Sequence, residues 1–194
     1  EGTVHVNIAL IIKFLQNYLF NPAKYEKIPQ RNDATDDAFL VDQGPTRKLG
    51  EFQFHDYNKA FELYDLPNLS IFKEQINTFK ESLVMAPASK EQMKDIDVML
   101  TIGEMFTLVP YAQLLLENAK IYGTDALVLD QIFDFIVRDF SKFALELHNK
   151  PSSTEKQMEY CRKLMRKTNV DTNRYETVWT KYVYPLNGAY TMKS

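Results

Sequence analysis

The stretch at residues 124–147, TDALVLDQIFDFIVRDFSKFALEL, decides the fold, because its apolar residues return every three or four positions. That spacing places them on one face of a helix with 3.6 residues per turn. The face consists of Leu129, Ile132, Phe133, Ile136, Phe140, Phe143, Ala144 and Leu147. Asp125 stands in the first turn, where a negative charge interacts favourably with the helix dipole. The pattern predicts an amphipathic helix that needs other helices to cover its apolar side.

Two further helices are predicted upstream of this stretch. The first begins at Pro67 and has an apolar face with the same spacing, formed by Leu69, Phe72, Ile76, Phe79 and Leu83. Ser89, followed three residues later by Gln92, has the pattern of a capping box, which predicts the start of a second and longer helix. Pro110 should kink or divide that helix, because proline lacks an N–H donor and clashes with the preceding turn.

The helices on either side of residues 124–147 are expected to follow short turns. Gly123 is a suitable left-handed C-cap for the preceding helix, so the two helices should pack antiparallel across a tight turn. Ser153 or Thr154 is a suitable N-cap for the helix that follows. A last helix is expected over residues 172–184, with Trp179 and Val183 as core contacts.

The first third of the chain has a different character. Residues 1–20 predict one apolar helix, which is too polar and too short for a membrane span. Residues 21–66 are rich in Pro, Gly, Asp and Asn and predict a long connector, with short helical turns at 34–41 and 57–63. We therefore expect an all-α protein, in which a helical bundle at residues 67–194 is preceded by one apolar helix and a long irregular connector.

Composition narrows the classes of function. The 194 residues are 45% hydrophobic and carry a formal net charge of -3, which disfavours both disorder and nucleic-acid binding. The single cysteine, Cys161, cannot form an internal disulfide and fits a reducing compartment. We expect bacterial cytoplasm, with a mitochondrial matrix as the second choice.

The titratable residues do not predict a metal site. Glu146 and His148 are two residues apart and cannot share a helical face, as a di-iron bundle would require. Asp130 and Asp134 lie on the helix at residues 124–147, but Asp134 and Arg138 have the i,i+4 spacing of a local ion pair. We expect these acids to form a solvated or locally paired surface.

A motif at the start of the chain carries the functional prediction. The string Glu-Gly-Thr-Val-His-Val-Asn at residues 1–7 runs into the apolar residues 8–11. This string resembles the last catalytic segment of FAD-dependent acyl-CoA dehydrogenases. Two further stretches, DQGPT at residues 42–46 and FHDY at residues 54–57, resemble a C-terminal extension found in some bacterial members of that family.

The resemblance implies a role for each residue of the motif. Glu1 would be the general base that removes the α-proton of an acyl-CoA thioester, while a hydride passes from the β-carbon to FAD. Gly2 would allow close approach of the backbone to the substrate. Thr3 and His5 would contact FAD at the start of the helix, where backbone N–H groups favour phosphate.

The same resemblance implies a domain organisation. Because the chain begins at Glu1 without methionine, we expect a fragment of a longer protein and an isolated chain that is inactive. Residues 1–20 would be the last helix of the catalytic domain, and residues 67–194 an extension for packing or assembly. Expected partners are acyl-CoA, an electron-transfer flavoprotein, the rest of the catalytic domain and a second copy of the protein. Two alternatives stay open: the C-terminal part of an acyl-CoA oxidase, and a helical interaction module without enzymatic activity.

Overall fold

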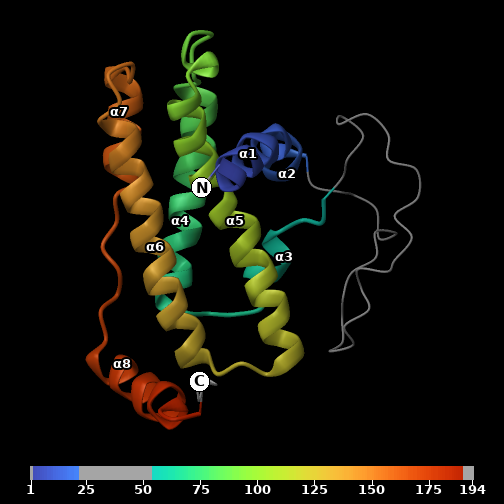
Figure 1. Ribbon diagram of the computed structural model, residues 1–194, viewed down its shortest axis with the longest axis vertical. Helices are drawn as coiled ribbons and strands as arrows, with labels where there is room; N and C mark the ends of the chain where they lie inside the picture. Colours follow the sequence, from blue (N-terminus) through green and yellow to red (C-terminus); the bar gives the residue numbers. More distant parts are fainter. Residues whose placement is uncertain (1, 22–53, 190–194) are drawn as a thin grey trace, which may run out of the picture.

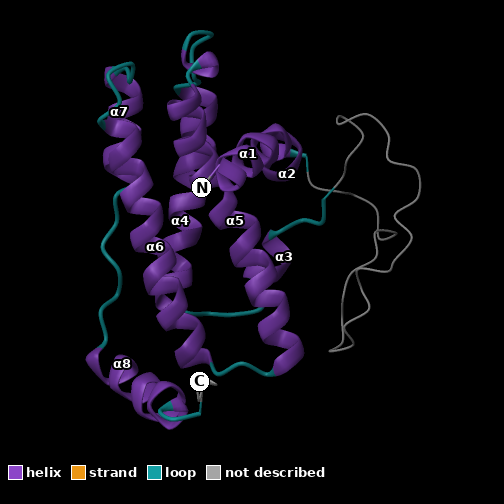
Figure 2. Cartoon of the chain, viewed as in Figure 1, coloured by secondary structure: helices purple, strands orange, loops and turns teal. Residues whose placement is uncertain are grey.

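Three long helices form the body of the protein. The computed structural model describes residues 2–21 and 54–189. Within them α4 (Pro67–Met85), α5 (Ile96–Tyr122) and α6 (Ala126–His148) lie side by side (Figure 1). Helices and loops make up this whole part of the chain, which has no strand (Figure 2). The predicted all-α helical bundle is therefore confirmed, although most of the predicted connector lies outside the described residues.

Shorter elements surround the three long helices. The chain opens with α1 (Gly2–Ile11), a 3₁₀ turn (Ile12–Phe14) and α2 (Leu15–Phe20), which together cross α5 (Figure 1). The remaining elements are α3 (Asn58–Phe61), a 3₁₀ turn (Gln92–Lys94), α7 (Glu155–Leu164), α8 (Thr172–Val178), a π-helical turn (Trp179–Val183) and a 3₁₀ turn (Tyr184–Leu186). The predicted short turn at residues 57–63 is confirmed by α3, whereas the one at 34–41 lies outside the described residues.

Several helix boundaries follow the local sequence signals. Gly123 ends α5 with φ of 64°, the left-handed conformation that glycine adopts without strain. The Asp125 side chain caps α6 by accepting a hydrogen bond from the backbone N–H of Leu127 at 2.9 Å. Thr154 forms a complete capping box with Gln157 at the start of α7. The predicted caps at Gly123 and Thr154 are confirmed, whereas Asp125, expected in the first turn of its helix, is the N-cap instead. All three caps depend on contacts between residues close in sequence.

The predicted start of α5 was wrong, and of the two outcomes expected at Pro110, a kink or a division, the division does not occur. Ser89 and Gln92 do exchange hydrogen bonds, at 2.8 and 3.2 Å, but they open only a 3₁₀ turn. The helix itself starts at Ile96 after a separate cap, Asp95. Pro110 does not divide α5, which is continuous over 27 residues. Buried residues on both sides of the proline are packed in the core, and this packing outweighs the local loss of a hydrogen bond.

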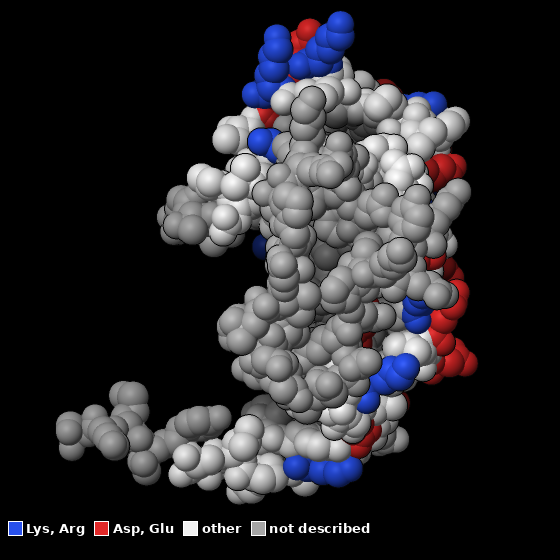
Figure 3. All heavy atoms as spheres, turned by 90° about the vertical axis from the view of Figure 1, so that its right-hand side faces the viewer, with Lys and Arg blue, Asp and Glu red and all other residues white. Residues whose placement is uncertain are grey.

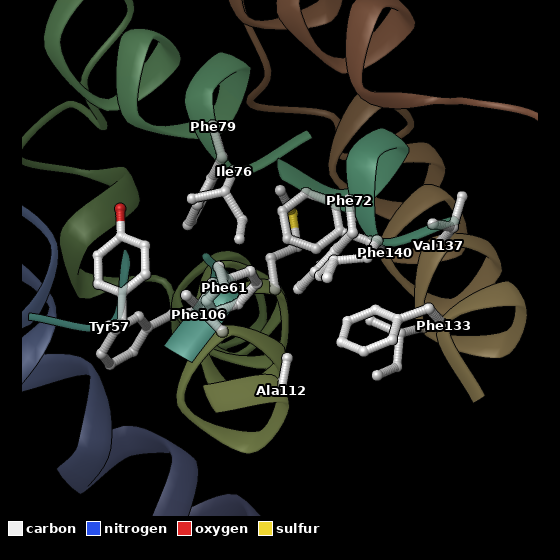
Figure 4. Packing of buried hydrophobic residues seen from close by; sticks show 14 of the residues in the cluster. Tyr57, Phe61, Phe72, Ile76, Phe79, Phe106, Ala112, Phe133, Val137 and Phe140 are labelled. Carbon is white, nitrogen blue, oxygen red and sulfur yellow. The ribbon is translucent and has the colours of Figure 1, made fainter. Parts of the chain in front are cut away.

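Aromatic rings connect the helices through the middle of the bundle (Figure 4). Tyr57 and Phe61 lie 5.8 Å apart between ring centroids, and Phe61 lies 6.1 Å from Phe72 on α4. Phe72 then meets Phe140 of α6 at 5.7 Å, and Phe79 meets Phe140 at 5.6 Å. Most of these pairs are edge to face, the arrangement that ring quadrupoles favour. The rings make α3, α4 and α6 parts of one core.

The opening helices share this core. Tyr18 and Leu19 of α2 are buried, and the Tyr18 ring packs against Tyr57 at 5.4 Å and against Phe106 of α5 at 5.6 Å. In the described residues, α1 and α2 therefore pack directly on the bundle that follows them in sequence.

The last helix differs from its prediction. Trp179 and Val183 were expected in the core, but they are 49% and 42% exposed. The buried side chain of α8 is instead Arg174, which is 4% exposed. The expectation was wrong because apolar spacing alone does not say which side of a short helix meets the bundle.

Charged side chains do not gather into one basic surface on the face seen in Figure 3. Where described residues are visible on that face, Lys and Arg occur at both ends of the molecule and also among the acidic residues that follow one edge.

Candidate functional site

The residues of the predicted catalytic motif lie at the start of α1. Glu1 lies outside the described residues. Gly2, Thr3 and His5 belong to the first turn of α1, although their side chains lie outside the described part of the molecule. The first N–H groups of an α-helix have no acceptor within the helix, so this turn has the backbone donors that a phosphate group requires.

A glycine fixes how closely α1 lies on α5. Ile8 is 7% exposed and faces Gly103 of α5. A Cβ atom at position 103 would lie 2.4 Å from Cγ2 of Ile8, well inside van der Waals contact. Only glycine permits this approach without movement. On the outer side of α1, Val6 and Leu10 are 59% and 50% exposed.

A buried tyrosine, Tyr18, attaches α2 to α5. The Tyr18 hydroxyl donates to the side-chain carbonyl of Gln113, and Gln113 donates onward to Glu117 at 2.8 Å. Burial, followed by the negative charge that Tyr57, Glu117 and Asp56 would present, raises the pKa of Tyr18 far above its usual value. Tyr18 is therefore a neutral hydrogen-bond donor, and its contacts fasten α2 to α5.

A buried ionic network lies between α6 and α8. Arg174 forms ion pairs with Asp130 and with Asp134, the second at 3.1 Å between Nη2 and Oδ2. Its Nε donates to Gln131 at 3.2 Å, and Nη2 also donates to the backbone carbonyl of Asn169 at 3.1 Å. The guanidinium and both carboxylates have side chains only 3–6% exposed. Four acceptors thus surround one planar cation, a geometry that suits arginine but not lysine.

The network continues to the start of α4. The backbone N–H of Asn68 donates to Asp130 at 2.8 Å, and its side-chain amide donates to the second carboxylate oxygen at 3.1 Å. Asn68 also exchanges hydrogen bonds with the backbone of Asn169, at 2.7 and 3.2 Å. Both carboxylate oxygens of Asp130 therefore have partners, as a buried charge requires.

The prediction of a solvated acidic surface on α6 was wrong in part. The pair between Asp134 and Arg138 is present, but Asp130 and Asp134 are 4% and 3% exposed and meet Arg174, forty or more residues away. The sequence did contain one signal, since Asp130 and Asp134 directly follow the buried residues Leu129 and Phe133. The arginine that completes the network has no local signal.

Three other features of the described residues concern cavities, metal binding and thiol reactivity. A hollow of about 230 Å³ lies between α3 and α4, and its lining includes Lys73 and Glu62. In the described residues no three His, Cys, Asp or Glu side chains gather as a metal site would require. Burial raises the pKa of the Cys161 thiol to about 11, which suits a packing role rather than a nucleophile.

One helix of the described part, α5, is long and apolar enough to cross a membrane. Half of its most apolar stretch is buried inside the bundle, and core helices of helical proteins have the same composition.

Comparison with known proteins adds no relative. No protein-family model, no curated protein and no solved structure matches the chain.

Proposed function

We propose that this chain is the C-terminal part of an FAD-dependent acyl-CoA dehydrogenase, which introduces an α,β double bond into acyl-CoA thioesters. The observation that carries the proposal is the Glu-Gly-Thr-Val-His-Val-Asn string at residues 1–7. Its position agrees with such a role, because residues 2–11 form an α-helix that follows Glu1 directly.

Each residue of the motif has a defined task in this proposal. Glu1 removes the α-proton: the Cα–H bond breaks, and the proton is held on the Glu1 carboxylate. Gly2 leaves room for the thioester to approach the backbone. Thr3 and His5 contact FAD, with the first turn of α1 providing N–H groups for phosphate. FAD, when bound, accepts the β-hydrogen as a hydride.

The rest of the chain supports the catalytic helix in this proposal. The close contact at Gly103 and the buried Tyr18 hold α1 and α2 on the bundle, so the extension would set the position of Glu1. We infer that the exposed Val6 and Leu10 side of α1 packs against the upstream catalytic domain. The pockets for acyl-CoA and for the flavin ring would then lie in that domain. We expect the isolated chain to be inactive and colourless.

The proposal is tested in the full-length protein, which would include the upstream catalytic domain. The measurement is exchange of deuterium at the α-carbon of a saturated acyl-CoA with solvent protons. Glu1→Gln should abolish this exchange while FAD remains bound, because an amide does not accept the proton. Glu62→Gln changes an exposed acid in the bundle and should leave exchange unchanged. Retained exchange in Glu1→Gln would remove Glu1 from its role.

The choice of electron acceptor separates the two related enzymes. An acyl-CoA dehydrogenase passes electrons to an electron-transfer flavoprotein, whereas an acyl-CoA oxidase passes them directly to oxygen. Rapid oxygen consumption by the full-length protein during turnover would favour the oxidase. A full-length protein that binds no flavin and no acyl-CoA would favour the interaction module instead.

A further inference from the structure

The segment after α7 returns along the bundle towards the start of α6 (Figure 1). We call residues 165–186 the C-terminal strap. It consists of a connection without helix, then α8 and the two turns that continue it. Within the strap, Arg174 is the one buried residue, with 4% of its surface exposed. A segment of this length normally needs several buried apolar side chains to remain in place.

Polar side chains of the long helices hold the first part of the strap. The Ser141 hydroxyl of α6 donates to the carbonyl of Arg166 at 3.1 Å and accepts from its N–H at 3.0 Å. Asn68 of α4 exchanges hydrogen bonds with the backbone of Asn169. The backbone N–H and C=O groups of Arg166 and Asn169 thus bond to side chains of α6 and α4, because the connection has no helix of its own to satisfy them.

The second part of the strap depends on Arg174. Val178 and Tyr182, at successive i+4 positions, continue the same side of the strap and are half-buried. The Tyr182 hydroxyl and the Lys181 ammonium both donate to Asp125, at 2.6 and 3.1 Å. Those contacts lie at the edge of the bundle, whereas Arg174 reaches buried carboxylates of α6.

The other side of the strap is apolar and exposed. Tyr175 and Trp179 stack on each other at 6.4 Å between ring centroids, and they are 53% and 49% exposed. Val183 and Leu186 are 42% and 54% exposed. These four side chains are therefore only partly covered, and none of them enters the core.

We propose that the C-terminal strap opens and closes on α6 as one unit, with Arg174 as its latch. In the closed state the Arg174 guanidinium balances the negative charges of Asp130 and Asp134. Without it, both buried carboxylates would lose their ion pair with α8. In the open state water solvates both carboxylates, while the α4, α5 and α6 core keeps its apolar contacts. The strap thus has its own equilibrium, separate from unfolding of the bundle.

The chain contains a built-in probe for this motion, because Trp179 is its only tryptophan. The test compares Arg174→Met with the parent chain by Trp179 fluorescence anisotropy and by amide hydrogen exchange. Arg138→Met is the matched control, because Arg138 also pairs with Asp134 but belongs to α6 and has a side chain 57% exposed. Both variants remove one arginine from the same carboxylate.

If Arg174 is the latch, Arg174→Met and Arg138→Met should give different results. In Arg174→Met, Trp179 anisotropy should fall, and amides of residues 172–183 should exchange about 100-fold faster, because closing leaves unpaired buried charge. Exchange in α4, α5 and α6 should not change. In Arg138→Met both readouts should match the parent chain. Parent-like exchange in the Arg174→Met strap would overturn the proposal, and so would equal acceleration in strap and core.

A second variant decides the question if Arg174→Met does not fold. Asp134→Asn keeps the shape of the site and leaves Arg174 its contacts with Asp130 and Gln131. Because one ionic contact becomes neutral, strap amides should exchange about 10-fold faster than in the parent chain, with no change in the core. Unchanged strap exchange in Asp134→Asn would overturn the proposal.

Discussion

The contact between α1 and α5 gives the sharpest test of the packing. In Gly103→Ala the added Cβ would lie 2.4 Å from Cγ2 of Ile8 and 3.5 Å from its backbone oxygen. Ordinary carbon contacts lie near 3.5–4.0 Å, so about 1 Å of movement is needed. Ile8 is β-branched and has one strongly preferred rotamer in a helix. The movement must therefore be made by α1 as a whole.

The expected free-energy change combines two opposing effects. Overpacking of a tight contact costs about 1–3 kcal/mol. Alanine is favoured over glycine in a helix interior by about 1 kcal/mol. The free energy of unfolding of Gly103→Ala should therefore fall by up to about 2 kcal/mol. In an Ile8→Ala background the clashing methyl group is gone, and Gly103→Ala should then stabilise the chain by up to about 1 kcal/mol.

The assay is urea unfolding of the parent chain, the two single variants and the double variant. The prediction is a change of sign in the effect of Gly103→Ala between the two backgrounds, a coupling of about 1–3 kcal/mol. An equal effect in both backgrounds would refute the argument, because it would mean that Ile8 is not the obstacle.

Three further predictions concern single sites. Burial raises the pKa of Cys161 to about 11 against 9.0 for a free thiol, so the thiolate is about 100-fold rarer at neutral pH. Ellman's reagent should therefore label Cys161 only after unfolding. Fast labelling of the folded chain would contradict this prediction. The Tyr182 hydroxyl is the largest of several contacts that lower the pKa of Asp125 from 3.8 to about 2. The stabilisation is therefore complete above pH 3.8 and is lost as pH falls towards 2; thermal unfolding across this range should show the loss in the parent chain but not in Asp125→Asn. Phe72→Ala should cost about 3–5 kcal/mol in urea unfolding, whereas Phe135→Ala, 53% exposed, should cost less than about 1 kcal/mol, and similar costs would show that the core is misplaced.

Local patterns in the sequence predicted most of the bundle. The period of Leu129, Phe133 and Phe140 gave α6 its buried side, since helical spacing by itself decides which residues share a face. Gly123 and Thr154 marked helix ends correctly, because a cap needs only neighbouring residues. The part of the fold that depends on contacts within a few positions was therefore predictable.

Features that depend on distant residues were not predictable in the same way. The Arg174 network joins residues from α4, α6 and α8. Gly103 is required by its close contact with Ile8 of α1, almost a hundred residues earlier. Trp179 has helical spacing with Val183, but the partner of α8 is a pair of carboxylates rather than an apolar surface. Sequence periodicity does not encode which side of a short helix will find such a partner.

The candidate site was predicted from a motif and not from geometry. The string at residues 1–7 identified Glu1 by resemblance alone, and Glu1 lies outside the described residues. What the fold adds is the attachment of α1, through Ile8 and Gly103, to a bundle that the motif itself does not imply.

The most direct test of the central claim is anaerobic reduction of flavin in the full-length protein. A saturated acyl-CoA thioester is added, and loss of the yellow absorbance of oxidised FAD is followed by stopped flow. Rapid bleaching is predicted for the parent protein, and none for Glu1→Gln with the same flavin content, because hydride transfer requires removal of the α-proton. Bleaching at the same rate in both proteins, or a parent protein that acyl-CoA does not bleach, would contradict the account.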